Sequence, residues 1–336
     1  MEPDPAARRT TAASVVGLLA SALFTFFAVA TTQAETIRAG SPWQDDPYDA
    51  VVSFTQFAVP ALCVFIVLRA LVGYGGTHST VRNAQLLRAS ALCAALVGMT
   101  ALADWVALLL RADRQRWNHS TPWLVFALGV VSTAVVVHGV MLRRAFRVTP
   151  WRAADVGEDW LADAVRGLHR VGRRWPSLAP VTTRLASETT VRLIRGHLVP
   201  VALLLGLVAA LGIVGALAVG EGWTDPWLIA WALFIEVASY FSFCMVVNAL
   251  LVLVRRPPLS RGRRATELAV VSGCLAVGVA VALRGPLWRV LHGGEVDKVT
   301  QLWQLTGGAG LLVGLLVLPF AFVVRRDGRA SPDPDY

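Results

Sequence analysis

The sequence predicts an all-α fold, a polytopic transmembrane helical bundle of about eight spans with both termini in the cytoplasm. Of the 336 residues, 55% are hydrophobic and only 16% are charged, whereas a soluble domain usually has about a quarter charged residues. The apolar residues gather in runs of roughly 20 or more, which is the length that a helix needs to cross a bilayer. Arginines fall mainly in alternate connections between these runs.

The apolar runs are continuous rather than alternating, so they predict helices and not barrel strands, because a lipid-exposed backbone must satisfy its own hydrogen bonds. The first run follows Arg8 and Arg9 and exceeds the roughly 7–15 apolar residues of a signal peptide, so we interpret it as a span. The predicted spans, in order, are 12–31, 50–71, 88–110, 122–142, 198–219, 227–254, 266–291 and 305–324.

Several spans contain residues that shape helix packing. Pro60 and Pro319 lie inside the second and eighth spans, where neighbouring helices can satisfy the freed backbone groups. Gly310 and Gly314 form a Gly-x-x-x-Gly pair in the eighth span, and such a pair permits close approach of another helix.

The distribution of basic residues predicts the topology. With the N-terminus inside, 24 of the 31 Lys and Arg residues lie on the cytoplasmic side and 7 on the outer side. Cytoplasmic loops of membrane proteins carry such an excess of basic residues. The basic loops are therefore explained by membrane insertion, and we expect no nucleic-acid binding.

The chain is predicted to be duplicated, as four spans followed by four. A shift of about 180 residues brings Trp123 onto Trp303, and a shift of 181 brings Cys63 onto Cys244 and Cys93 onto Cys274. Because each half starts inside, this is a parallel repeat about an axis along the membrane normal. The expected parts are a first half over 1–147, a cytoplasmic linker over 148–196, a second half over 197–327 and a tail over 328–336.

The linker 148–196 contains a predicted amphipathic helix. Apolar residues recur at helical spacing with arginines between them, which is typical of a helix on a membrane surface: Trp160, Ala164, Val165, Leu168, Val171 and Trp175. A plain connector is the alternative interpretation. A protein partner would bind here if the linker has a regulatory role.

Three charged residues fall inside spans, namely Asp104, Glu236 and Arg284. Intramembrane charges are costly and usually face protein or water, so we expect a buried ion cluster of Arg284 with Asp104, Glu236 or both. The shift of about 180 residues places Asp104 on Arg284 and Gln56 on Glu236. Tyr240 and Asn248 share a helix face with Glu236, since they follow it by multiples of four.

These six residues, Asp104, Glu236, Arg284, Gln56, Tyr240 and Asn248, are the candidate substrate- or ion-binding site, and a structural lock between helices is the alternative. The sequence favours a small-molecule or ion transporter, or alternatively a non-enzymatic regulatory or assembly protein that acts through its basic cytoplasmic face. An enzyme is the weakest hypothesis because no catalytic motif is present.

We expect no cofactor and no metal, since there is no Cys-x-x-Cys and no pair of histidines four residues apart. The strong preference for Arg over Lys suggests a GC-rich bacterial genome and hence a bacterial plasma membrane, with the lipid bilayer as the partner of the spans.

Overall fold

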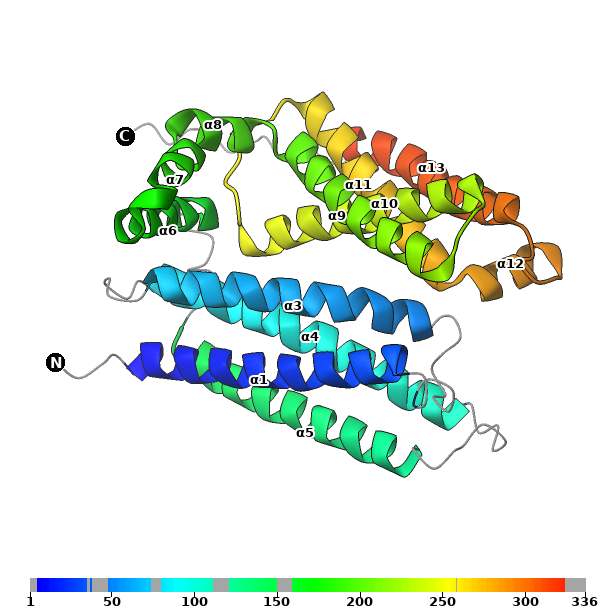
Figure 1. The fold of residues 1–336 in the computed structure, drawn as a ribbon, viewed down its shortest axis with the longest axis horizontal. Helices are drawn as coiled ribbons and strands as arrows, with labels where there is room; N and C mark the ends of the chain where they lie inside the picture. Colours follow the sequence, from blue (N-terminus) through cyan, green and yellow to red (C-terminus); the bar gives the residue numbers. More distant parts are fainter. Residues whose placement is uncertain are drawn as a thin grey trace. The chain divides into compact units, whose positions relative to one another are not determined.

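The computed structural model describes residues 5–34, 37, 48–73, 80–110, 121–149, 159–257 and 259–323, and in these residues the chain is helical and contains no strand (Figure 1). The long helices, in order, are α1 (Pro5–Gln33), α3 (Tyr48–Gly73), α4 (Thr80–Leu110), α5 (Thr121–Phe146), α9 (Leu198–Glu221), α10 (Pro226–Leu251), α11 (Arg261–Ala282) and α13 (Val299–Val323). The short helices are α6 (Trp160–Arg174), η3 (Pro176–Leu178), α7 (Ala179–Leu185), α8 (Glu188–Gly196) and α12 (Arg284–His292).

Seven of the helices in the described ranges are long and apolar enough to cross a membrane, so the chain is a multi-pass membrane protein. They are α1, α4, α5, α9, α10, α11 and α13. The predicted second span coincides with α3, which has 26 residues and contains the shorter apolar segment Phe54–Ala70. The eighth crossing therefore stays a prediction, as does the orientation of the termini. The predicted tail 328–336 lies outside the described residues.

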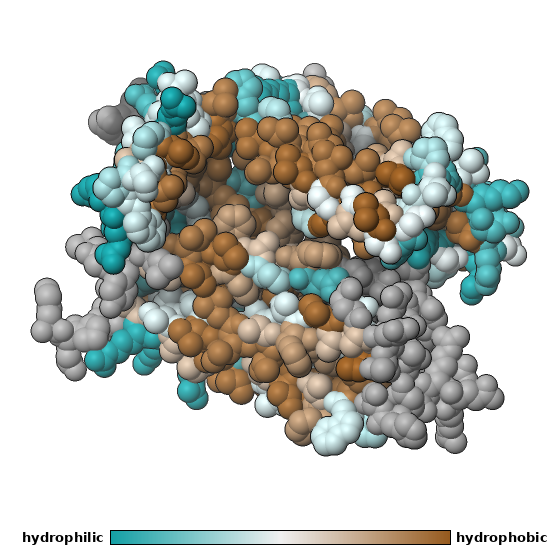
Figure 2. Space-filling view, viewed as in Figure 1, coloured by the Kyte–Doolittle hydropathy of each residue, from teal (hydrophilic) through white to brown (hydrophobic). Residues whose placement is uncertain are grey.

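The outer faces of the long helices are apolar. Leucines such as Leu311, Leu312 and Leu315 of α13 are exposed, and so are Leu204 and Val208 of α9. Figure 2 shows hydrophobic side chains over much of the visible surface of the helices. A contiguous apolar surface of this kind is unfavourable in water and is typical of helices that face lipid.

The chain forms two compact units, and the first comprises the residues up to Val191 together with Ala249–Val254. In this unit α1, α3, α4 and α5 pack against one another. Large side chains such as Phe24, Val59 and Leu128 fill the core between them. A Cβ atom on Gly17 of α1 would lie 2.6 Å from ring atoms of His138 of α5, so a residue without a side chain is needed beside this buried imidazole.

The second unit comprises Arg192–Asn248 and the residues from Arg255 onward. Its tightest contact joins α11 to α13: a Cβ atom on Gly273 would lie 2.8 Å from the carbonyl oxygen of Gly310, and one on Gly314 would lie 3.4 Å from that of Ala269. The predicted close packing at Gly310 and Gly314 is thus confirmed. On α10, the Trp231 indole donates a hydrogen bond to the Thr306 hydroxyl of α13 at 3.2 Å.

The seventh span differs from the prediction in length. We expected a span over 266–291, but α11 ends at Ala282 and a separate helix, α12, begins at Arg284. Pro286 explains the break: in a continuous helix it would remove a hydrogen bond and clash with the preceding turn, whereas the first turn of a new helix tolerates it. Arg284 is the first residue of α12 and not part of α11, so its position within the membrane stays a prediction.

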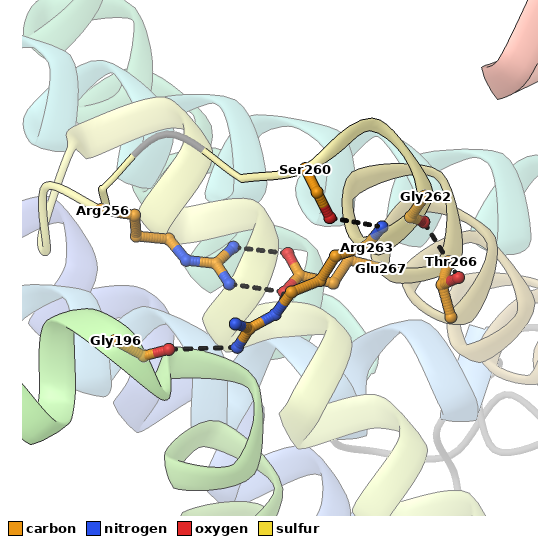
Figure 3. A network of polar contacts seen from close by, with 7 residues as sticks. All are labelled: Gly196, Arg256, Ser260, Gly262, Arg263, Thr266 and Glu267. Atoms are coloured by element: carbon orange, nitrogen blue, oxygen red, sulfur yellow. Dashed lines mark hydrogen bonds and ion pairs between the residues drawn. The ribbon is translucent and has the colours of Figure 1, made fainter.

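A polar network fixes the start of α11 (Figure 3). The guanidinium of Arg256 donates two hydrogen bonds to the carboxylate of Glu267, each 2.7 Å long, and both side chains are largely buried. Arg263 lies 3.6 Å from the same carboxylate and donates to the carbonyl oxygen of Gly196 at 3.1 Å. The Ser260 hydroxyl accepts a hydrogen bond from the backbone N–H of Arg263 and caps the helix. The network joins the first turns of α11 to the last residue of α8 and to the loop that precedes α11.

Replacing Glu267 with Gln should lower the free energy of unfolding by about 1–3 kcal/mol, because it removes a bidentate charge-assisted interaction from a largely buried arginine. Thermal unfolding in detergent or nanodiscs measures the change. Glu295→Gln is the control, since the Glu295–Arg289 pair is exposed and 3.8 Å long and should contribute less than about 1 kcal/mol. Equal effects of the two substitutions would contradict this account of the network.

Candidate functional site

Helix α4 carries Asp104 into the core of the first unit. Its exposed fraction is 0%, and neither of its carboxyl oxygens has a hydrogen-bond partner in the described part of the chain. Neighbouring positions on the helix, such as Ala101, Ala107 and Leu108, belong to the apolar core of the unit. An isolated carboxylate is very unfavourable in such surroundings. Asp104 is therefore the buried carboxyl group of the described residues of this unit that most needs an explanation.

Hydroxyl and amide groups link the helices of the first unit. Thr100 lies one helical turn before Asp104, and its hydroxyl is 3.2 Å from the Thr55 hydroxyl of α3. Gln56 of α3 lies 3.1 Å from the Thr32 hydroxyl of α1. Between α4 and α5, the Trp105 indole donates a hydrogen bond to the Ser132 hydroxyl at 3.0 Å. These contacts join α1 to α3, α3 to α4 and α4 to α5 within the unit that contains Asp104.

The other predicted site residues lie in the second unit. Glu236, Tyr240 and Asn248 are on α10 and are half-buried, and their role as a polar face directed at protein stays a prediction. The backbone of Gly206 of α9 packs against Tyr240, because a Cβ atom on that glycine would lie 3.4 Å from the Cβ atom of Tyr240. A pair of Arg284 with Asp104 would join the two units, and the ion cluster stays a prediction.

A second polar centre lies where α6 meets the end of α3. Asp163 of α6 pairs with Arg69 at 2.9 Å, lies 3.8 Å from the Nε atom of Arg82 and also pairs with Arg166. The guanidinium of Arg69 donates a further hydrogen bond to Gln85 of α4. Asp163 and Arg69 are buried, so this carboxylate holds α3, α4 and α6 together.

Aromatic and backbone contacts complete the attachment of α6. The Arg69 guanidinium lies 4.7 Å from the centre of the Trp160 ring, a cation–π contact, and Phe65 meets the same ring edge-on. The Asp159 carboxylate caps the helix by accepting a hydrogen bond from the backbone N–H of Ala162. The linker helix is therefore docked on the first unit through Trp160 and Asp163.

This centre was not predicted from the sequence. The apolar periodicity of the linker helix predicts a role for Trp160, but it does not point to Asp163 or Arg69. One signal was present: Asp163 is the only acidic residue in the segment 160–174, among four arginines. An isolated acid within a basic amphipathic helix is a sign of a specific ion pair, although spacing alone cannot identify its partner.

Among the described residues, no three His, Cys, Asp or Glu side chains lie close enough to hold a metal ion. The chain matches no family model, no curated protein and no solved structure. Its activity must therefore be inferred from its own residues.

Proposed function

We propose that this membrane protein transports a cation, in the simplest case a proton, and that Asp104 is the group that binds it. The observation that carries the proposal is a fully buried carboxyl group without a hydrogen-bond partner among the described residues of the first unit. Intramembrane carboxyl groups of transporters and pumps serve as proton and ion sites. A purely structural aspartate would be expected to have a partner, as Asp163 has.

The helix order supports the finer architecture that we propose, a parallel repeat of four helices with both termini in the cytoplasm. The series α1, α3, α4, α5 is followed by α9, α10, α11 with α12, and α13. A shift of about 180 residues brings the last three members of the two series into approximate register. The second half has polar groups of its own, Glu236, Tyr240, Asn248 and Arg284, and we propose that they contribute to ion binding there. The excess of arginine over lysine supports a bacterial plasma membrane.

The substitution Asp104→Asn should lower cation flux by about tenfold or more, while the protein stays folded. The amide is close in shape to the carboxyl group but can neither release a proton nor neutralise a cation. The measurement uses protein in liposomes that contain a pH-sensitive dye, with a potassium gradient and valinomycin to set the membrane potential. Sodium or potassium uptake into separate vesicles without valinomycin tests the other cations.

Asp297→Asn is the matched control, since Asp297 is an exposed carboxylate. It should leave both flux and thermal stability unchanged. The thermal stability of Asp104→Asn should equal or exceed that of the wild type, because the change removes a group that is unfavourable when buried. Two results would overturn the proposal. In the first, vesicles with the wild-type protein are as impermeable to protons, sodium and potassium as protein-free vesicles. In the second, the Asp104→Asn variant retains full flux.

A further inference from the structure

The segment after α6 folds back on this helix to form a short arm. Helix α6 is followed by η3 and α7, and α7 packs against α6 at Gly172. A Cβ atom on Gly172 would lie 2.4 Å from the Thr182 hydroxyl and 3.5 Å from the Cα atom of Ala179. Thr182 and Ala186 are buried on the inner side of this arm. The arm is therefore a packed structure and not a loose connection.

The other side of the arm carries exposed apolar residues. Trp175, Leu178, Val181 and Leu185 are 53%, 44%, 57% and 52% exposed. Leu178, Val181 and Leu185 are spaced by three and four residues, so they form a line along one face of η3 and α7, and Trp175 directly precedes this helical segment. Figure 2 shows hydrophobic and hydrophilic residues side by side over the region that Figure 1 labels α6 and α7.

Positive charges border this apolar line. Arg173, Arg174 and Arg184 are exposed, and no acidic side chain of the described residues pairs with them. Arginine next to exposed leucine, valine and tryptophan is the composition of helices that lie in the interface of a membrane containing anionic lipids. Tryptophan is also enriched at the level of the lipid headgroups.

The arm is attached where a membrane surface is expected. The preceding helix, α6, is fixed to Arg69 through Asp163 and Trp160, and Arg69 is the next-to-last residue of the apolar segment Phe54–Ala70 of α3. The arm thus continues from a helix whose first turn is attached at the end of an apolar segment.

We propose that this arm binds the surface of an anionic lipid bilayer. Trp175, Leu178, Val181 and Leu185 enter the boundary between headgroups and acyl chains, and Arg173, Arg174 and Arg184 contact the lipid phosphates. The observations favour lipid over a protein partner or a second copy of the chain. The apolar line is narrow, three exposed arginines lie next to it in the sequence, and the helix that precedes the arm is attached at the end of an apolar segment.

Lipid-borne quenchers test the proposal. The full-length protein, with its four cysteines replaced and its thermal stability verified, receives a single cysteine through Val181→Cys and is labelled with the fluorophore NBD. It is placed in nanodiscs that contain brominated phosphatidylcholine, with or without phosphatidylglycerol. Thr183→Cys is the control, because Thr183 is also exposed on α7 but faces away from the apolar line.

We expect brominated lipid to quench the label at position 181 in nanodiscs with phosphatidylglycerol, and to leave the label at 183 bright. Replacing Arg173, Arg174 and Arg184 with Gln together should reduce the quenching at 181 by about twofold or more, as should high salt. Three results would overturn the proposal: no quenching at 181, quenching at 183 equal to that at 181, or the same quenching with and without phosphatidylglycerol. If a second copy of the chain or another protein covered position 181, the label there would not be quenched, which is the first of these three results.

Discussion

Replacing Asp163 with Asn is expected to release α6 from the first unit and to lower the free energy of unfolding by about 3–5 kcal/mol, the usual effect of removing one partner from a buried ion pair. Arg69 is 3% exposed. After the substitution its guanidinium would remain buried without the carboxylate that neutralises it, and Arg82 would still lie beside it. An asparagine can accept a hydrogen bond from one of these groups but cannot neutralise their charges.

The expected change has a local and a global component. Thermal unfolding reports the loss of stability of the whole unit, and hydrogen exchange or limited proteolysis over 160–185 reports the release of α6 and the arm. Arg166→Gln is the control, because Arg166 also pairs with Asp163 but its side chain is 42% exposed, so its removal should cost less than about 1 kcal/mol.

A double variant separates the ion pair from the packing of α6. Removing both charges with Arg69→Met and Asp163→Leu should restore much of the lost stability, since well-packed apolar side chains can replace a buried ion pair with little or no loss. Unchanged protection of residues 160–185 in Asp163→Asn would show that Trp160 and the backbone contacts hold α6 without the ion pair. This result would contradict the central role assigned to Asp163.

The sequence was sufficient to predict the helices but not all of their ends. Apolar runs of about 20 residues identify spans because the bilayer sets their length. Hydropathy is averaged over a window of many residues, and this averaging hid the end of α11. The apolar residues on either side of Leu283 form one hydropathy peak. Pro286 was the local signal for the break. It indicates that helix ends in apolar runs should be assigned from proline positions as well as from hydropathy.

The candidate site was predictable only in part. Asp104 was identified because a single carboxyl group within an apolar run is conspicuous, and its burial follows from the position of Thr100 and Asp104 on one helix face. The pairing of Asp163 with Arg69 was not predictable, because it joins segments far apart in the sequence and depends on how α6 folds back on α3. The need for glycine at position 17 was not predictable either, because it depends on contact with His138, which lies three long helices later in the sequence.

Replacing Gly273 with Ala is expected to lower the free energy of unfolding of the second unit by about 1–3 kcal/mol, the usual cost of overpacking a tight contact. The added methyl group would lie 2.8 Å from the carbonyl oxygen of Gly310. This atom belongs to the backbone of α13, so no side chain can rotate to make room. The two helices must separate, and dispersion contacts along their whole interface weaken.

Two comparisons make this prediction specific. Gly278→Ala on the same helix meets only the Ser239 hydroxyl, at 4.0 Å, so it should be neutral or stabilising by about 0.5–1 kcal/mol through the higher helix propensity of alanine. In Gly310→Ala the nearest atom is Cγ2 of Val277, at 2.8 Å. Because this is a side-chain atom, adding Val277→Ala should recover part of the loss, whereas the same addition should not rescue Gly273→Ala. Equal stability of Gly273→Ala and Gly278→Ala in thermal unfolding would show that α11 and α13 do not approach as closely as this contact requires.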